Sequence, residues 1–91
     1  MIGEARVLSR NEGISQQNLG EGEGAVVLAI ATGQLYTCND TTAKFLATID
    51  GKRTFGEIVD ELGRTYKVSR EELRNDFSEL AEKLIEDGII R

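Results

Sequence analysis

The side chains of this chain that could carry out chemistry are carboxylates and a single thiol. Its 91 residues include no histidine and one cysteine, Cys38. A histidine general base and a tetrahedral zinc site of Cys and His ligands are therefore both excluded. Two carboxylate pairs, at positions 60–61 and 71–72, are adjacent on predicted helices, and adjacent helical residues do not converge on a substrate. We predict that the protein is not an enzyme and holds no metal or other cofactor.

The charge balance limits the kinds of partner. The chain has 16 acidic and 11 basic residues and a net charge of −5, which opposes attraction to nucleic-acid phosphates. It has no apolar run near the ~18 residues of a membrane span. One cysteine cannot form an internal disulfide, which favours a reducing, cytoplasmic location. We expect a single small domain that meets peptides or proteins, with no nucleic acid and no membrane among its partners.

Three strands are predicted in the first part of the chain. Residues 1–13 show no period and are predicted to form a flexible N-terminal arm, so that the domain covers residues 14–91. The predicted strands, separated by turns rich in glycine, are residues 14–19, 25–30 and 34–38. Residues 25–30 form a β-branched apolar run, which is typical of the middle strand of a sheet.

Three helices are predicted to follow. Asn39 or Asp40 can cap the first helix. The other two begin with capping-box spacings, Thr54 with Glu57 and Ser69 with Glu72. Gly88 ends the third helix, and Ile89 and Ile90 can fold back over the core. The apolar positions at helical spacing are Phe45, Leu46, Ile49, Phe55, Ile58, Val59, Leu62, Leu73, Phe77, Leu80 and Leu84. We predict a winged-helix-like α+β fold, in which a three-stranded antiparallel sheet precedes three helices.

This arrangement suggests a peptide site with two parts. A third strand at a sheet edge offers unpaired N–H and C=O groups to an extended peptide. The apolar stripe of the third helix extends to Ala81 and Ile85, and a groove beside that flank suits an apolar peptide side chain. Two alternatives stay open. The flank can equally belong to the core, and Lys44 can protect the strand edge from pairing without any peptide partner.

Three motifs occur in a distinctive order. They are GAVVLAIATGQLYTCN at 24–39, DGKRTFGEIV at 50–59 and LIEDGII at 84–90. Over about residues 14–91 the chain resembles the PqqD family, which recognises leader peptides in pathways that modify ribosomally made peptides. The resemblance implies that a leader adds as an antiparallel strand to the third strand and rests on the third helix.

By position, the resemblance assigns peptide contacts to Leu35, Tyr36, Thr37, Cys38, Arg74, Phe77, Ser78, Ala81 and Ile85. Two positions depart from the family pattern. Cys38 stands where leucine is usual, and Leu35 replaces a common aromatic residue. We expect Cys38 to act as a small hydrophobic residue. The preferred peptide can therefore differ from that of other members.

The expected function is a non-catalytic adaptor that holds a precursor's leader and presents the peptide to a modifying enzyme such as a radical-SAM protein, a cyclase or a leader protease. A homodimer formed through the same strand edge stays open. One alternative is a winged-helix DNA-binding domain, but positions 69–87 hold seven acidic and three basic residues, which opposes DNA binding. Another is an acyl-carrier-like protein, which needs a serine behind an aspartate, whereas Ser69 follows Val68.

Overall fold

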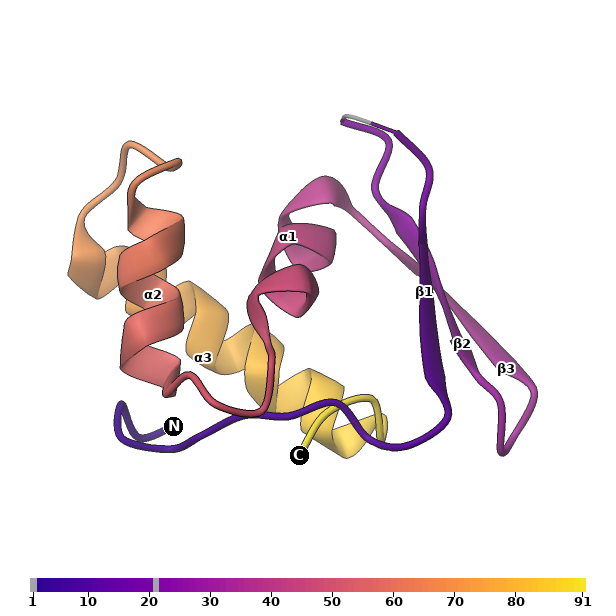
Figure 1. The fold of residues 1–91 in the computed structure, drawn as a ribbon. Helices are drawn as coiled ribbons and strands as arrows, with labels where there is room; N and C mark the ends of the chain where they lie inside the picture. Colours follow the sequence, from indigo (N-terminus) through magenta and orange to yellow (C-terminus); the bar gives the residue numbers. More distant parts are fainter. Residues whose placement is uncertain (1, 21) are drawn as a thin grey trace.

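A computed structural model describes residues 2–20 and 22–91 and shows a small sheet with helices on one side of it (Figure 1). The strands are β1 (Ile14–Asn18), β2 (Ala25–Ala29) and β3 (Gln34–Cys38). The helices are α1 (Asp40–Thr48), α2 (Phe55–Gly63) and α3 (Arg70–Glu86). The predicted α+β class, with three antiparallel strands followed by three helices, is confirmed.

The sheet has the order β1-β2-β3 with antiparallel pairing throughout, so β2 is central and β3 forms one edge. Side chains alternate between the two faces of a strand. Tyr36 and Cys38 are accordingly half-buried, whereas the side chain of Leu35 is 65% exposed. Gly24 has a φ of +80°, and a Cβ there would collide with the carbonyl oxygen of Cys38. The glycine therefore allows the chain before β2 to pass directly against the end of β3.

The helix ends follow the caps expected from the sequence. Asn39, rather than Asp40, caps α1, since its Oδ1 accepts the Thr42 N–H at 2.8 Å. Thr54 and Glu57 form both hydrogen bonds of a capping box at α2. At α3, Ser69 Oγ accepts the Glu72 N–H at 3.2 Å. These bonds satisfy amide groups that a helix start leaves without intrahelical partners.

The core lies where the sheet and the helices meet. Phe45 of α1 and Phe77 of α3 stack with ring centroids 5.0 Å apart. Ile89 and Ile90, after the turn at Gly88, are both buried, as predicted. Within residues 2–20 and 22–91, no helix combines the length and the apolarity needed to cross a membrane.

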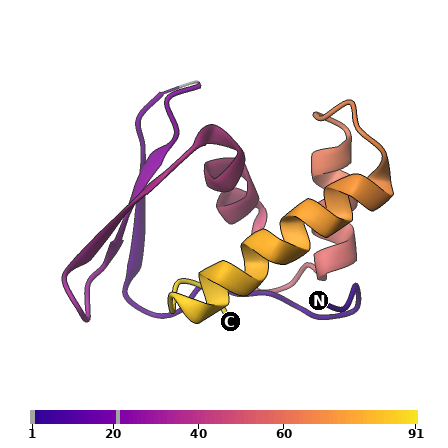
Figure 2. The same cartoon turned by 180° about the vertical axis from the view of Figure 1, so that it is seen from behind.

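The N-terminal segment, residues 2–13, contributes to this core, which the sequence analysis did not predict. It runs along the base of the helices and past the C-terminal end of the chain (Figures 1 and 2). Leu8 is completely buried and Ile2 is 4% exposed. The backbone carbonyls of Glu4 and Arg6 accept the Gly56 and Phe55 N–H groups at 2.9 and 2.7 Å. Hydrogen bonds to distant parts of the chain and two buried side chains hold this segment, although it shows no hydrophobic period.

Candidate functional site

The free edge of β3 is the first part of the candidate site. Within residues 2–20 and 22–91, β3 pairs with β2 on one side and with no strand on the other. In an antiparallel ladder, every second residue directs both its N–H and its C=O groups to the same neighbouring strand. Alternate residues of Gln34–Cys38 therefore present hydrogen-bonding groups outward. An extended peptide could pair with them.

A groove beside this edge is the second part. It has a volume of about 230 Å³ and lies between β3, the start of α1 and the C-terminal half of α3. Its lining residues are Tyr36, Thr37, Cys38, Asn39, Thr42, Leu80, Lys83, Leu84, Asp87 and Ile89. The phenol oxygen of Tyr36 lies 3.0 Å from Gln34 Oε1 and 3.4 Å from the Asp87 carbonyl oxygen, which connects β3 to the end of α3.

One face of α3 forms the wall opposite β3. Leu80, Lys83, Leu84 and Asp87 follow the i, i+3, i+4, i+7 spacing of a single helix face. Leu84 is buried and Leu80 is half-buried, whereas Lys83 and Asp87 are exposed. The groove therefore has apolar side chains at its base and charges at its rim. This arrangement suits a peptide that places an apolar side chain in the groove and keeps its polar backbone at the rim.

Cys38 lies in this groove as a lining residue. Burial raises the pKa of its thiol. Because the thiolate is the nucleophilic form, a raised pKa favours an unreactive, protonated side chain. The environment supports the expectation that Cys38 serves as a small hydrophobic residue.

The structure divides the residues that the resemblance assigned to the site. Tyr36, Thr37 and Cys38 line the groove. Leu35 shares the free edge through its backbone, but its side chain is on the exposed, alternate face of the strand. None of the five assigned residues of α3 lines this groove. These residues are Arg74, Phe77, Ser78, Ala81 and Ile85.

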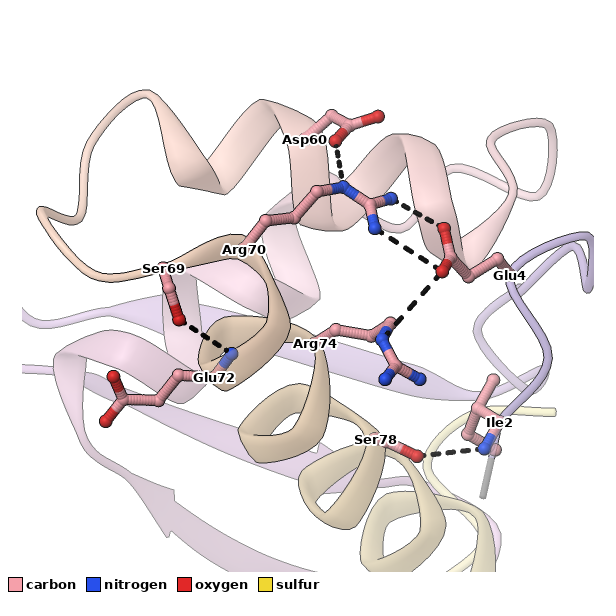
Figure 3. Close-up of polar contacts among 8 residues, drawn as sticks. All are labelled: Ile2, Glu4, Asp60, Ser69, Arg70, Glu72, Arg74 and Ser78. Carbon is pink, nitrogen blue, oxygen red and sulfur yellow. Dashed lines mark hydrogen bonds and ion pairs between the residues drawn. The ribbon is translucent and has the colours of Figure 1, made fainter.

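The N-terminal segment covers part of α3 instead (Figure 3). The backbone N–H of Ile2 donates to Ser78 Oγ at 2.8 Å, and Ser78 is buried. Glu4 pairs with Arg70 at 2.6 Å and lies 3.8 Å from the Arg74 guanidinium. The hydrogen bond from Arg70 lowers the pKa of Glu4. We call Arg74 and Ser78, with their partners Ile2 and Glu4, the covered flank of α3.

The other assigned residues of α3 are also withdrawn from the surface. Phe77 and Ala81 are buried in the core, and Ile85 is half-buried against it. A peptide in the groove would therefore meet a different side of α3 from the one that the sequence analysis selected.

Seven further groove residues were not predicted from the sequence, namely Asn39, Thr42, Leu80, Lys83, Leu84, Asp87 and Ile89. Leu80 and Leu84 were predicted to belong to the core stripe, and Lys83 and Asp87 were counted only among the charges of positions 69–87. The helical spacing of these four residues was a usable signal. The rotation of α3 about its axis was not predictable from that spacing, because an aperiodic segment covers the alternative side.

Comparisons with known proteins identify a matching family. The family model for coenzyme PQQ synthesis protein D (PqqD) matches residues 24–90. No curated protein sequence matches the chain.

Three solved structures share the fold. TbiB1 in complex with the TbiA(beta) leader peptide has a TM-score of 0.79 at 16% identity, covering 91% of this chain and 94% of that one. A lasso peptide synthetase B1 complexed with the leader peptide has a TM-score of 0.79 at 22% identity, covering 93% and 98%. The PqqD truncation of Methylobacterium extorquens PqqCD, described as a functional and stand-alone recognition element, has a TM-score of 0.81 at 19% identity, covering 100% and 95%.

Proposed function

This chain belongs to the PqqD family, and from that membership we propose that it binds the leader segment of a ribosomally synthesised precursor peptide by strand addition. The observation that carries the proposal is the free edge of β3 beside an apolar groove. The leader would pair antiparallel to β3, which continues the pattern of the sheet. Two structures with the same fold are described as complexes with leader peptides.

Backbone pairing and side-chain anchoring share the binding energy in this proposal. Each backbone hydrogen bond contributes only ~0.5 to 1.5 kcal/mol net. Several such bonds, together with one or two apolar side chains in the groove, correspond to micromolar binding, at about −8 kcal/mol. The backbone bonds tolerate many sequences, so the groove residues would set the preference among leaders.

The adaptor would act by raising effective concentration rather than by catalysis. A leader held on the domain turns the meeting of precursor and modifying enzyme into a nearly intramolecular event. The enzyme would be a radical-SAM protein, a cyclase or a leader protease. A second copy pairing at β3 would compete with the leader, since one edge accepts one ladder. The alternative of a DNA-binding domain gains no support from the comparisons.

The test is an NMR titration of the isotope-labelled protein with the leader of a precursor peptide encoded beside its gene. We expect backbone amide shifts in β3, the start of α1 and the groove face of α3. Hydrogen exchange adds a sharper criterion. Every second amide of β3 should gain protection, because only the outward-directed N–H groups acquire a new partner.

Two outcomes would contradict the proposal. One is saturation by the leader with no change at β3. The other is the absence of binding at high micromolar peptide, both for the protein alone and after the neighbouring modifying enzyme is added.

A further inference from the structure

One end of the groove is formed by the turn that follows α3, residues 87–90. Asp87 and Ile89 of this turn line the groove. Gly88 between them has a φ of +79°, and the chain reverses there, so that the Ile89 N–H donates to the Leu84 carbonyl oxygen at 2.9 Å. The position of this turn therefore determines how far that wall of the groove stands from β3.

The direct link between the turn and β3 is weak. The hydroxyl oxygen of Tyr36 lies 3.4 Å from the Asp87 carbonyl oxygen, which is longer than the distance of about 2.5–3.0 Å that is usual for a hydrogen bond from a hydroxyl group. Tyr36 also has a nearer acceptor, Gln34 Oε1 at 3.0 Å. Other contacts therefore have to hold the turn in its place beside the strand.

Asn11 of the N-terminal segment holds this turn and does not itself line the groove. Its backbone N–H donates to the Ile89 carbonyl oxygen at 3.0 Å. Its side-chain amide donates to the Gly88 carbonyl oxygen at 2.7 Å and lies 3.4 Å from that of Ile90. A single residue thus contacts three consecutive carbonyl groups of the chain after α3.

The preceding residue, Arg10, joins the same segment to the other elements around the groove. Its guanidinium donates to Gln16 Oε1 of β1 at 2.7 Å and to the Leu46 carbonyl oxygen of α1 at 2.8 Å. The segment passes beside the C-terminal end of the chain in both views of the ribbon (Figures 1 and 2). Arg10 and Asn11 therefore connect the sheet, α1 and the end of α3, which are the elements that surround the groove.

We propose that Asn11 is a positioning residue of the leader site. By holding residues 88–90, its side-chain amide keeps the groove at the width that accepts a leader side chain, although Asn11 itself lies outside the groove. This proposal rests on the proposed leader binding and makes the N-terminal segment a determinant of leader affinity.

The experiment is a double-mutant cycle between the protein and the leader of the neighbouring precursor. An alanine scan of the leader first identifies the residue whose side chain contributes most to binding. Calorimetric titration then measures the affinity of the natural leader and of that alanine variant for the unmodified protein and for Asn11→Ala. The matched control is Ser78→Ala, which also removes one hydrogen bond of the N-terminal segment but lies outside the groove. Thermal melting verifies that each variant is folded at the assay temperature.

We expect Asn11→Ala to weaken binding of the natural leader by about 2- to 10-fold. Its effect on the leader that already lacks the main side chain should be much smaller. Ser78→Ala should bind both leaders like the unmodified protein. A loss of stability alone would not produce this pattern, because a folded variant with an undistorted groove binds both leaders as before.

Hydrogen exchange in the unmodified protein adds a measurement that needs no variant. Because coupling between two sites is reciprocal, a bound leader should increase the protection of the Asn11 N–H. The Gly56 N–H, which donates to the Glu4 carbonyl oxygen of the same segment, should gain less protection. Equal gains at both amides would indicate stabilisation of the whole fold and would contradict the positioning role.

The outcomes separate the positioning role from the proposed function. If β3 amides shift with the natural leader, but Asn11→Ala weakens both leaders equally or neither of them, Asn11 does not position the groove and leader binding stands. If the natural leader does not perturb β3 in the unmodified protein, both proposals are overturned.

Discussion

The two sides of α3 differ in what lies against them. On the covered flank, Ser78 is buried under Ile2, and Arg74 lies beside Glu4 (Figure 3). On the groove side, Leu80 and Lys83 lie across an open hollow from β3. The presence of small and apolar residues on a helix flank thus does not show that the flank is free to bind. Residues 2–13, which show no hydrophobic period, cover Arg74 and Ser78 on one side of α3.

The dependence of the covered flank on the N-terminal segment leads to the largest expected effect. Leu8 is completely buried, so Leu8→Ala should lower the free energy of unfolding by about 2–5 kcal/mol, measured by chemical denaturation. Val7→Ala is the matched control, because Val7 is 46% exposed, and it should change stability by no more than about 0.5 kcal/mol. Equal unfolding midpoints for the two variants would show that residues 1–13 are the flexible arm that the sequence suggests.

A smaller effect on stability is expected at Ser78, and it should leave leader binding unchanged. Ser78→Ala removes the acceptor of the Ile2 N–H, and an unsatisfied buried donor costs about 1–3 kcal/mol. Leader affinity should not change, because Ser78 does not line the groove. A loss of affinity in a variant that is fully folded at the assay temperature would show that Ser78 contributes to the binding surface. Calorimetric titration and thermal melting provide the two measurements.

The contrast between the two sides of α3 can be tested with one pair of variants. Leu80 and Ile85 are both half-buried aliphatic residues of α3, and of the two only Leu80 lines the groove. We expect Leu80→Ala to weaken leader binding by about 1–2 kcal/mol and Ile85→Ala to have no measurable effect on affinity. Both should lose a similar amount of stability, since both lose comparable buried surface. The reverse ranking of affinities would support the flank that the sequence analysis selected.

The sequence was sufficient for the features that depend on local chemistry. Strand β3, the Thr54 capping box and the turn at Gly88 all rest on short motifs. The free edge of β3 was also predictable, because hairpin connections place the third strand beside the second and away from the first. The strand edge, which is half of the candidate site, was therefore predictable from the sequence.

The other half depends on interactions between distant parts of the chain. Helical spacing shows which residues of α3 share a face, but not which face meets β3. That choice depends on Ile2 and Glu4, more than 60 positions away from their partners Ser78 and Arg70. The sequence analysis also interpreted Gly24 only as a turn residue, although its close approach to Cys38 requires glycine. Neither the contacts of Ile2 and Glu4 nor the close approach of Gly24 to Cys38 can be recognised from a local sequence pattern.

The ion pair of Glu4 offers the smallest and most selective way to test the covered flank. Its pKa is lowered mainly by the hydrogen bond from Arg70. Because the folded pKa lies below the value of about 4.3 for an ordinary Glu, the ionised carboxylate stabilises the fold at neutral pH. That contribution is lost as the pH falls through the lowered folded pKa. Glu4 is exposed to solvent, so the effect should be small and weakened by salt.

Glu4→Gln should therefore melt slightly below the unmodified protein at pH 7, and the gap should close as the pH falls below about 4. Thermal melts at low ionic strength between pH 3 and pH 7 measure this gap. Leader affinity at pH 7 should be the same for both proteins, since Glu4 lies outside the groove. A gap that stays constant with pH would mean that the charge of Glu4 does not hold the N-terminal segment on α3. The segment would then depend on the buried Ile2 and Leu8, and the covered flank would be closed by packing rather than by charge.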